Sequence, residues 1–308
     1  MFRSWQDLVG QRHGHIPRRF AIGAGNVAGL IVLTAGTLTA QQAPARQASG
    51  HLNPAVAKLA AGQPMVGTST SDLSLANAHA LARSNFDYVY VDMEHGPFNF
   101  ESLAWFVAGM VDKEAAVKKG SPAPNVAVFA RFPPYGRENA QWIVKQALDL
   151  GLMGVIFNGI DNKEQAELMV RNMRYPQQKT SKYQQPPGLR GYAPGNAVFA
   201  WGVSGADYVR RADVWPLNPE GDLLAIPMIE TAEGLKNANE IASVPGVGAI
   251  FLGAGADLSQ WLGVPMNSPE VESARQTILE ACKAHDVACG ITETTKAGID
   301  KRLQEGGG

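Results

Sequence analysis

Two stretches of the sequence end an apolar run on a single carboxylate. Glu230 closes the run that begins at Ala225, and Asp257 closes the run that begins at Gly246. A helix-forming segment follows each run, which is the pattern of a buried parallel strand and its helix. Carboxylates at the C-terminal tips of such strands lie where α/β proteins place metal and substrate groups. Glu230 and Asp257 are therefore predicted to bind one divalent cation, with structural capping as the alternative.

Further polar side chains follow two other predicted strands. Asp92, Glu94 and His95 come after the apolar run that starts at Asp87, and Arg131 ends another. The cluster after the first run is also consistent with a capped turn and a hydrogen-bonded histidine. Arg131 is equally consistent with a plain ion pair to a neighbouring carboxylate. In a parallel barrel, however, all these side chains would meet on one face.

The residue types define the chemistry that such a face could support. Two carboxylates, waters and a substrate that chelates through two oxygens satisfy octahedral Mg²⁺ or Mn²⁺. The same ligands are too few and too hard for a structural zinc site. The cation would polarise a carbonyl and stabilise an enolate, Arg131 would neutralise a carboxylate or the enolate oxygen, and His95 would move a proton. This combination predicts carbon–carbon bond cleavage or formation next to a 2-oxo acid.

The elements that must position these residues alternate along the chain as strand and helix. This predicts an α/β barrel that is one βα unit short, with the eighth strand of a complete barrel expected beyond Gly308. The irregular stretch Tyr175–Pro219 is long enough for a lid or a binding loop, and Tyr208–Ala212 within it is consistent with a short helix. A lysine-rich linker precedes Asn125. The seven predicted strands are Pro64–Ser69, Asp87–Asp92, Asn125–Arg131, Gly154–Gly159, Leu223–Glu230, Val247–Asp257 and Val287–Thr292.

The first forty residues have the features of a secretory signal. Arginines precede a short apolar segment, and Leu38–Ala40 has a small-residue cleavage pattern. We therefore expect export, with the bacterial periplasm as the destination and no stable membrane span after processing. An uncleaved anchor, or a cytoplasmic protein with a mis-assigned start codon, remains an alternative. Residues 41–52 are predicted to be a linker, and residues 53–308 the barrel.

Composition excludes one class of partner and leaves the redox state open. The chain has 308 residues and a formal net charge of -1, so it lacks the general basic character of nucleic-acid-binding proteins. Its two cysteines, Cys282 and Cys289, fall in a predicted helix and a predicted strand. An oxidising compartment would permit a bond between them, but the helix-to-strand placement favours two separate buried thiols.

Six motifs resemble those of the HpcH/HpaI aldolase/citrate lyase family, in the same order from about Asn53 onwards. These motifs are Val91–Gly96, Arg131 before Pro133 and Pro134, Leu148–Gly151, Pro187–Gly191, Ile229–Thr231, and Gly253 with Ala256–Ser259. Members of that family are (β/α)₈-barrel, metal-dependent class II pyruvate aldolases. They usually form hexamers built from trimers of helix-swapped dimers. The resemblance therefore implies a homo-oligomer that uses Mg²⁺ or Mn²⁺, with Co²⁺ as a further candidate, and binds a small 2-oxo acid and an aldehyde.

The resemblance also implies roles for individual residues. Glu230 and Asp257 become the metal ligands, His95 the acid–base residue, and Asp149 a support for His95. Arg131 would hold pyruvate or its enolate. The backbone of Gly253, Ala254, Gly255 and Ala256 would receive the pyruvate carboxylate.

Departures from the family pattern leave two other functions open. Met228 stands where the family often has glutamine, and Gly253–Asp257 has one extra residue. One alternative is a related lyase that acts on an acyl-CoA or another dicarboxylate. The other is a catalytically idle binding protein of the same fold, which the absent last βα unit would favour.

Overall fold

The computed structural model describes residues 50–133, 141–253 and 255–305. The predicted signal peptide and most of the predicted linker lie outside these residues. The end of the predicted linker is packed against the fold, because Leu52 is buried and its N–H donates to Asp222 Oδ1 at 2.9 Å. Asn53 caps the first helix and donates to the backbone oxygens of Met153 and Asp222. Residues 51–53 are therefore packed as part of the fold.

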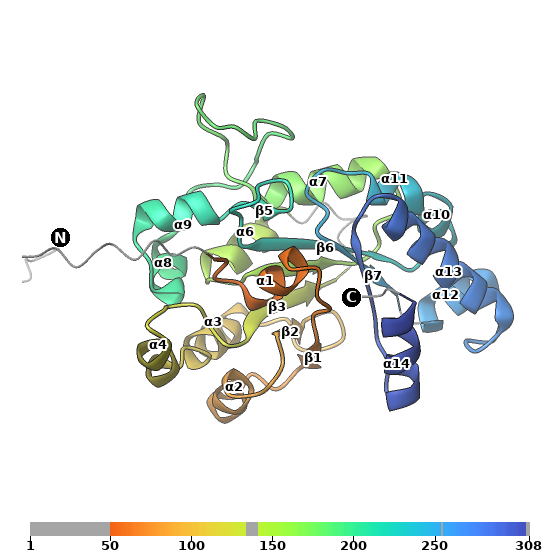
Figure 1. Cartoon of the computed structure of the whole chain (residues 1–308), viewed down its shortest axis with the longest axis horizontal. Coiled ribbons are helices and arrows are strands. Elements are labelled where there is room, and N and C mark those ends of the chain that lie inside the picture. The colour runs from red at the N-terminus through yellow and green to blue at the C-terminus, as the bar shows by residue number, and fades with distance from the viewer. Residues whose placement is uncertain (1–49, 134–140, 254, 306–308) are drawn as a thin grey trace, which may run out of the picture. The chain divides into compact units, whose positions relative to one another are not determined.

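One parallel sheet forms the centre of the described residues (Figure 1). Its neighbouring strands run in the order β1-β2-β3-β4-β6-β7-β8, and β5 pairs with β6. The central strands are buried along their whole length, which is the pattern of a parallel sheet covered on both faces. The strands are β1 (Gly67–Thr70), β2 (Tyr88–Asp92), β3 (Ala127–Phe132), β4 (Gly154–Phe157), β5 (Val214–Trp215), β6 (Leu223–Ile229), β7 (Ala249–Leu252) and β8 (Ala288–Ile291).

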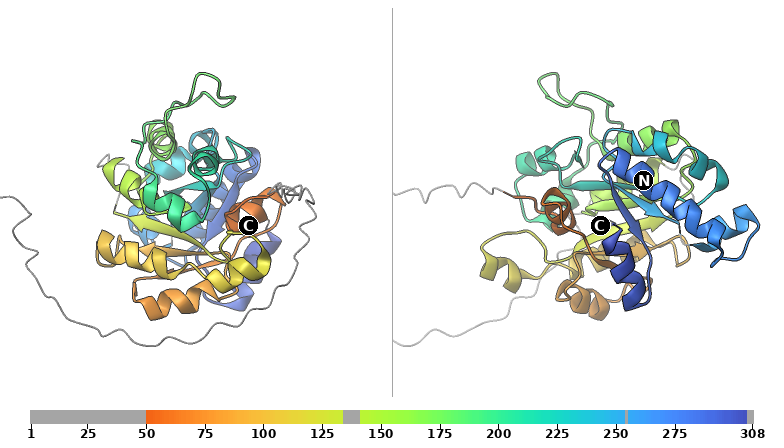
Figure 2. Two further views of the ribbon diagram at one scale, coloured as in Figure 1. Left: turned by 90° about the vertical axis from the view of Figure 1, so that its left-hand side faces the viewer. Right: turned by 45° about the vertical axis from the view of Figure 1, so that its right-hand side comes forward.

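Helices follow most strands and cover the sheet. In Figure 1, α7 and α11 lie on one side of the strands and α2 and α3 on the other. The segment between α7 and α8 projects away from the sheet in every view (Figures 1 and 2). The helices are α1 (Pro54–Ala60), α2 (Leu75–Ala82), α3 (Phe100–Gly109), α4 (Lys113–Lys119), α6 (Gln141–Asp149), α7 (Lys163–Met173), α8 (Gly195–Trp201), α9 (Gly205–Arg211), α10 (Ala232–Lys236), α11 (Ala238–Ala242), α12 (Gly255–Leu262), α13 (Pro269–Ala284) and α14 (Lys296–Gln304).

The sheet curls like part of a barrel, but its two edges do not pair. Among the described residues, no backbone ladder joins β1 to β8. A cavity of about 290 Å³ lies between these two strands, and α14 contributes part of its lining. The observed fold is a curled, parallel α/β half-barrel. Its sheet is less closed than the nearly complete barrel that the sequence predicts.

Three local predictions are wrong. The predicted lysine-rich linker is the helix α4, because Asp112 caps its N-terminus and Gly120 ends it in the left-handed conformation. The predicted irregular stretch Tyr175–Pro219 contains α8 and the short strand β5, in addition to the short helix α9 that was expected at Tyr208–Ala212. The strand predicted to reach Asp257 ends at Leu252, so Asp257 belongs to the first turn of α12.

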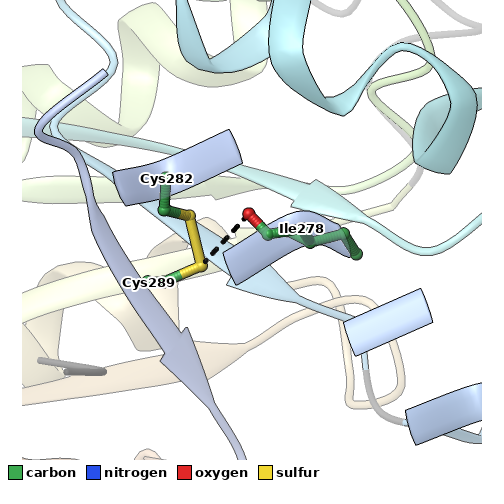
Figure 3. The surroundings of a disulfide bond; sticks show 3 residues. All are labelled: Ile278, Cys282 and Cys289. Carbon is green, nitrogen blue, oxygen red and sulfur yellow. Dashed lines mark hydrogen bonds between the residues drawn. A yellow bond between two sulfur atoms is a disulfide. The ribbon is translucent and has the colours of Figure 1, made fainter. Parts of the chain in front are cut away.

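The two cysteines form a disulfide bond instead of the two free thiols expected. Cys282 in α13 and Cys289 in β8 have Cα atoms 6.0 Å apart, which is a normal separation for a disulfide (Figure 3). The helix ends at Ala284 and the strand begins at Ala288, so a short turn brings the two residues face to face. This bond fastens the edge strand β8 to α13.

Among the described residues, no helix is both long enough and apolar enough to cross a membrane.

Candidate active site

The C-terminal tips of β2, β3 and β6 bring charged side chains to one edge of the sheet. Asp92 and Arg131 are direct partners in the β2–β3 register. Glu230 is the first residue after β6. Because the strands are parallel, these tips share one edge although they lie far apart in the sequence.

Arg131 is held by two carboxylates and an aromatic ring. Its Nε donates to Asp92 Oδ1 at 3.1 Å, and its Nη1 lies 3.1 Å from Glu94 Oε2. The guanidinium carbon lies 5.6 Å from the centre of the Tyr90 ring. Burial raises the pKa of Asp92, but Arg131 and the backbone N–H groups of Glu94 and His95 together outweigh burial and keep that pKa below its ordinary value. The ion pair that was the alternative interpretation of Arg131 is therefore present, and it fixes the guanidinium in place.

His95 lies at the exposed side of this cluster. Its Nε2 is 3.3 Å from Glu94 Oε2, and its side chain is 66% exposed. The backbone N–H groups of Glu94 and His95 both donate to Asp92 Oδ1, at 3.2 and 3.3 Å. Asp92 therefore ties down the loop that carries His95, while the imidazole stays open to a ligand.

Glu230 is a half-buried acid close to other negatively charged side chains. Its Oε1 accepts a hydrogen bond of 2.8 Å from the Gly159 N–H. Burial and the nearby carboxylate of Glu94 raise its pKa to about 7, and Asp257 adds to this shift. Arg131 and the Gly159 hydrogen bond oppose the rise without cancelling it. Glu230 therefore experiences negative charge that the described side chains do not compensate.

The turn after β7 brings Asp257 near Glu230. The Gly253 N–H donates to Ile229 O at 2.9 Å, which continues the β6–β7 pairing into the turn. A Cβ atom on Gly253 would lie 2.4 Å from the Glu230 Cβ, so only glycine allows this close approach. Asp257 itself is exposed in the first turn of α12.

These carboxylates fit a divalent cation that is bound through few protein ligands. Burial and neighbouring negative charge raise the pKa of Glu230, and a cation beside this acid would favour its ionised form. Within the described ranges, no three His, Cys, Asp or Glu side chains form a complete metal cage. Two carboxylates would leave coordination positions for water and substrate, as catalytic metals require.

Asp149 does not reach His95 within the chain. It is the last residue of α6, which returns the chain to the opposite end of the sheet before β4 begins. Its carboxylate accepts from Arg190 Nη2 at 2.9 Å and from Lys145 Nζ at 2.5 Å. The sequence resemblance assigned Asp149 to the site, but the fold of one chain keeps it at the other edge.

The predicted carboxylate-binding turn is only partly within the described residues. Gly253 is buried beside Glu230, and Gly255 and Ala256 begin α12. Ala254 lies outside the described residues.

Sequence reasoning missed Asn158 and Gly159, which follow β4 at the same edge. Asn158 is fully buried, and its Nδ2 donates to Phe132 O at 2.9 Å. Gly159 supplies the N–H that holds Glu230. The signal that could have identified them is their position at a strand tip, but neither residue carries a charge that would mark it as a candidate.

Comparison with known proteins gives this site a context. The family model HpcH/HpaI aldolase/citrate lyase matches residues 72–306. The chain is 32% identical to a 2-dehydro-3,6-dideoxy-6-sulfogluconate aldolase of Pseudomonas putida, over 78% of this chain and 82% of the relative. It is 30% identical to a hydroxypyruvate/pyruvate aldolase of Paraburkholderia phytofirmans, over 79% of this chain and 84% of the relative.

A solved structure agrees with these relatives. The crystal structure of an HpcH/HpaI aldolase/citrate lyase family protein from Burkholderia cenocepacia J2315 superposes with a TM-score of 0.67 at 29% identity, covering 83% of this chain and 90% of that protein. The residues that the family model matches include strands β2 to β8 and every strand tip described above. The chain belongs to the HpcH/HpaI aldolase/citrate lyase family.

Proposed function

We propose that this carbon–carbon lyase is a divalent-metal-dependent aldolase that cleaves a 4-hydroxy-2-oxo acid to pyruvate and an aldehyde. The observation that carries the proposal is the pairing of opposite charges at one sheet edge. Arg131, held by Asp92 and Glu94, lies in the electrostatic field of the uncompensated acid Glu230. A 2-oxo acid and a cation together complement this arrangement.

Glu230 and Asp257 are the residues that would hold the cation. When bound there, Mg²⁺ or Mn²⁺ supplies Lewis-acid stabilisation for an enolate oxygen. Gly159 keeps one oxygen of Glu230 oriented, so the other oxygen remains free to act as a ligand. Co²⁺ would suit the same oxygen ligands.

Arg131 and His95 would carry the remaining steps. The Arg131 guanidinium would neutralise the 2-oxo acid or its enolate, and its ion pairs keep it from reorganising during the reaction. His95 would take the proton from the 4-hydroxyl group and return a proton to the enolate carbon, with Glu94 beside its Nε2. The N–H groups of Gly255 and Ala256 would receive the substrate carboxylate.

The names of the relatives support the class of substrate. The two relatives reported above and a 5-keto-4-deoxy-D-glucarate aldolase of Escherichia coli strain K12, 28% identical over 252 residues, are all named as aldolases. These names refer to sugar-derived acids or to pyruvate. This agreement supports a 2-oxo acid as one part of the substrate. The aldehyde stays unassigned, because the relatives differ in that part of their substrates.

Three wider features belong to the same proposal. The curled sheet would act as an incomplete (β/α)₈ barrel, and the protein would work as a homo-oligomer. The predicted secretory signal would bring it to the periplasm. The Cys282–Cys289 disulfide supports this location, because such bonds persist in oxidising compartments.

A screen of aldol activity tests the proposal. Pyruvate would be incubated with a panel of aldehydes and Mg²⁺, Mn²⁺ or Co²⁺, and consumption of pyruvate would be measured. We expect turnover with at least one aldehyde, complete loss after EDTA treatment, and recovery when Mg²⁺ or Mn²⁺ is restored. Turnover that survives chelation would contradict the metal requirement, and no turnover with any aldehyde would contradict the reaction.

A further inference from the structure

Asn158 is a fully buried amide between strand tips that carry opposite charges. It follows β4, which lies between β3 with Arg131 and β6 with Glu230. Its Nδ2 donates to the backbone oxygen of Phe132, the residue after Arg131, at 2.9 Å. Asn158 therefore binds the end of β3 to the end of β4, just beyond their last ladder pair, Phe132 and Phe157.

The side-chain oxygen of Asn158 indicates that this residue does more than stabilise the fold. Its Oδ1 is buried and has no hydrogen-bond partner among the described residues. An unpaired buried acceptor is unfavourable, and an apolar side chain of similar size would avoid that penalty. A side-chain hydrogen bond from Asn158 also lowers the pKa of Glu94, against the rise that burial causes. The side-chain amide of Asn158 therefore interacts with the cluster of charged residues at the strand tips.

Gly159, the next residue, links the end of β4 to Glu230, the predicted metal ligand. Its N–H donates to Glu230 Oε1 at 2.8 Å. Its φ angle is +64°, a left-handed conformation that glycine adopts without strain and other residues rarely adopt. Two consecutive residues thus hold the strand end that carries Arg131 and the carboxylate of Glu230.

We propose that Asn158 and Gly159 form a positioning clamp that sets the separation and orientation of the Arg131 guanidinium and the Glu230 carboxylate. The clamp neither moves a proton nor binds the substrate. It determines whether a cation at Glu230 and a 2-oxo acid at Arg131 fit together. This inference rests on the proposed function, because it assigns the clamp to that cation and that acid.

Binding of Mn²⁺ to the full metal-free chain tests the clamp without relying on turnover. Free Mn²⁺ would be followed by its paramagnetic resonance signal in the presence and absence of oxalate. For Asn158→Leu we expect at least tenfold weaker binding of Mn²⁺ with oxalate, together with a melting temperature that is equal to or above that of the unmodified chain. Asn158→Ser, which folds with a smaller change in packing but is too short to reach Phe132 O, should weaken binding similarly.

Asn172 provides the matched control for the asparagine. It is fully buried in α7, and neither polar atom of its side chain has a partner among the described residues. Asn172→Leu should change the melting temperature in the same direction as Asn158→Leu and leave Mn²⁺ binding within twofold of the unmodified chain. Equal Mn²⁺ binding by the unmodified chain and both Asn158 variants would overturn the proposal.

Gly62 provides the matched control for the glycine. It has a φ angle of +66° and open space around it at the end of α1. Gly159→Ala should weaken Mn²⁺ binding at least tenfold, whereas Gly62→Ala carries the same backbone strain and should leave binding unchanged. If the unmodified chain binds Mn²⁺ and Gly159→Ala binds it equally, the clamp is wrong while the proposed function stands. If the unmodified chain binds no Mn²⁺, both are wrong.

Discussion

Glu230 combines burial, one backbone hydrogen bond and two neighbouring acids. Burial and the two acids raise its pKa to about 7, against an ordinary value of 4.5, although the hydrogen bond lowers it. The folded, metal-free protein therefore binds this proton more tightly than the unfolded chain does. As the pH rises from about 4.5 to about 7, the folded state loses the stability that the protonated acid gave it, and little more is lost above pH 7.

The pH dependence of stability tests this reading of Glu230. The melting temperatures of the metal-free protein and of Glu230→Gln would be compared between pH 4.5 and pH 8. The unmodified protein should lose stability relative to the variant as the pH rises towards 7, because only it carries the titrating group. Saturating Mg²⁺ should remove the loss, since the cation compensates the ionised carboxylate. A difference that stays constant across this range would contradict the account.

Residue type and strand position together made much of the site predictable. Glu230, Arg131 and Asp92 are charged groups that directly end apolar runs, and burial at a strand tip is uncommon for such groups unless they are paired. Asn158 was not predictable, because an amide after a strand is a common turn residue. The position of Asp149 depends on the direction in which α6 crosses the sheet, which a local motif does not contain.

At the scale of elements, the disulfide joins the last helix before β8 to the edge strand itself. The two cysteines are separated by 7 positions in the sequence. A loop of this size gives a disulfide a stabilising effect of about 2 kcal/mol, mainly because it restricts the unfolded chain. Both cysteines are buried in the core, so the bond lies away from bulk solvent.

Urea unfolding with and without a thiol reductant measures this contribution. Reduction, or the double change Cys282→Ser with Cys289→Ser, should lower the free energy of unfolding by about 2 kcal/mol. The reductant should have no further effect on the double variant, which serves as the control. Two titratable thiols in the untreated, unfolded protein would show that the bond does not form.

The elements differ in how far the sequence could predict them. The bounds of α7 and α14 can be predicted from the sequence, because both helices begin after clear polar N-caps and have a regular pattern. The strand β5 has only two residues and forms because β6 lies beside it, so no local periodicity could reveal it. Disulfide pairing depends on a turn of a few residues between helix and strand, and that geometry is not local to either cysteine.

At the scale of the whole sheet, seven strands appear in the predicted order, each beside the next along the chain apart from the interposed β5. Short crossover connections favour such neighbours, so order followed from the alternation of elements. The alternation does not determine whether the barrel closes, because the pairing of β1 with β8 would be the longest-range contact in the fold. The unpaired edges leave the site intact, since its charged residues come from the tips of β2, β3, β6 and the turn after β7.

Binding of oxalate tests the central claim most directly. Oxalate resembles the enolate of pyruvate and needs both a cation and a positive side chain, so it reports on Glu230 and Arg131 together. Calorimetric titration of the full chain should show oxalate binding in the presence of Mg²⁺, no binding after EDTA treatment, and no binding by Glu230→Gln even with Mg²⁺. Oxalate binding of equal strength with and without the cation would contradict the account.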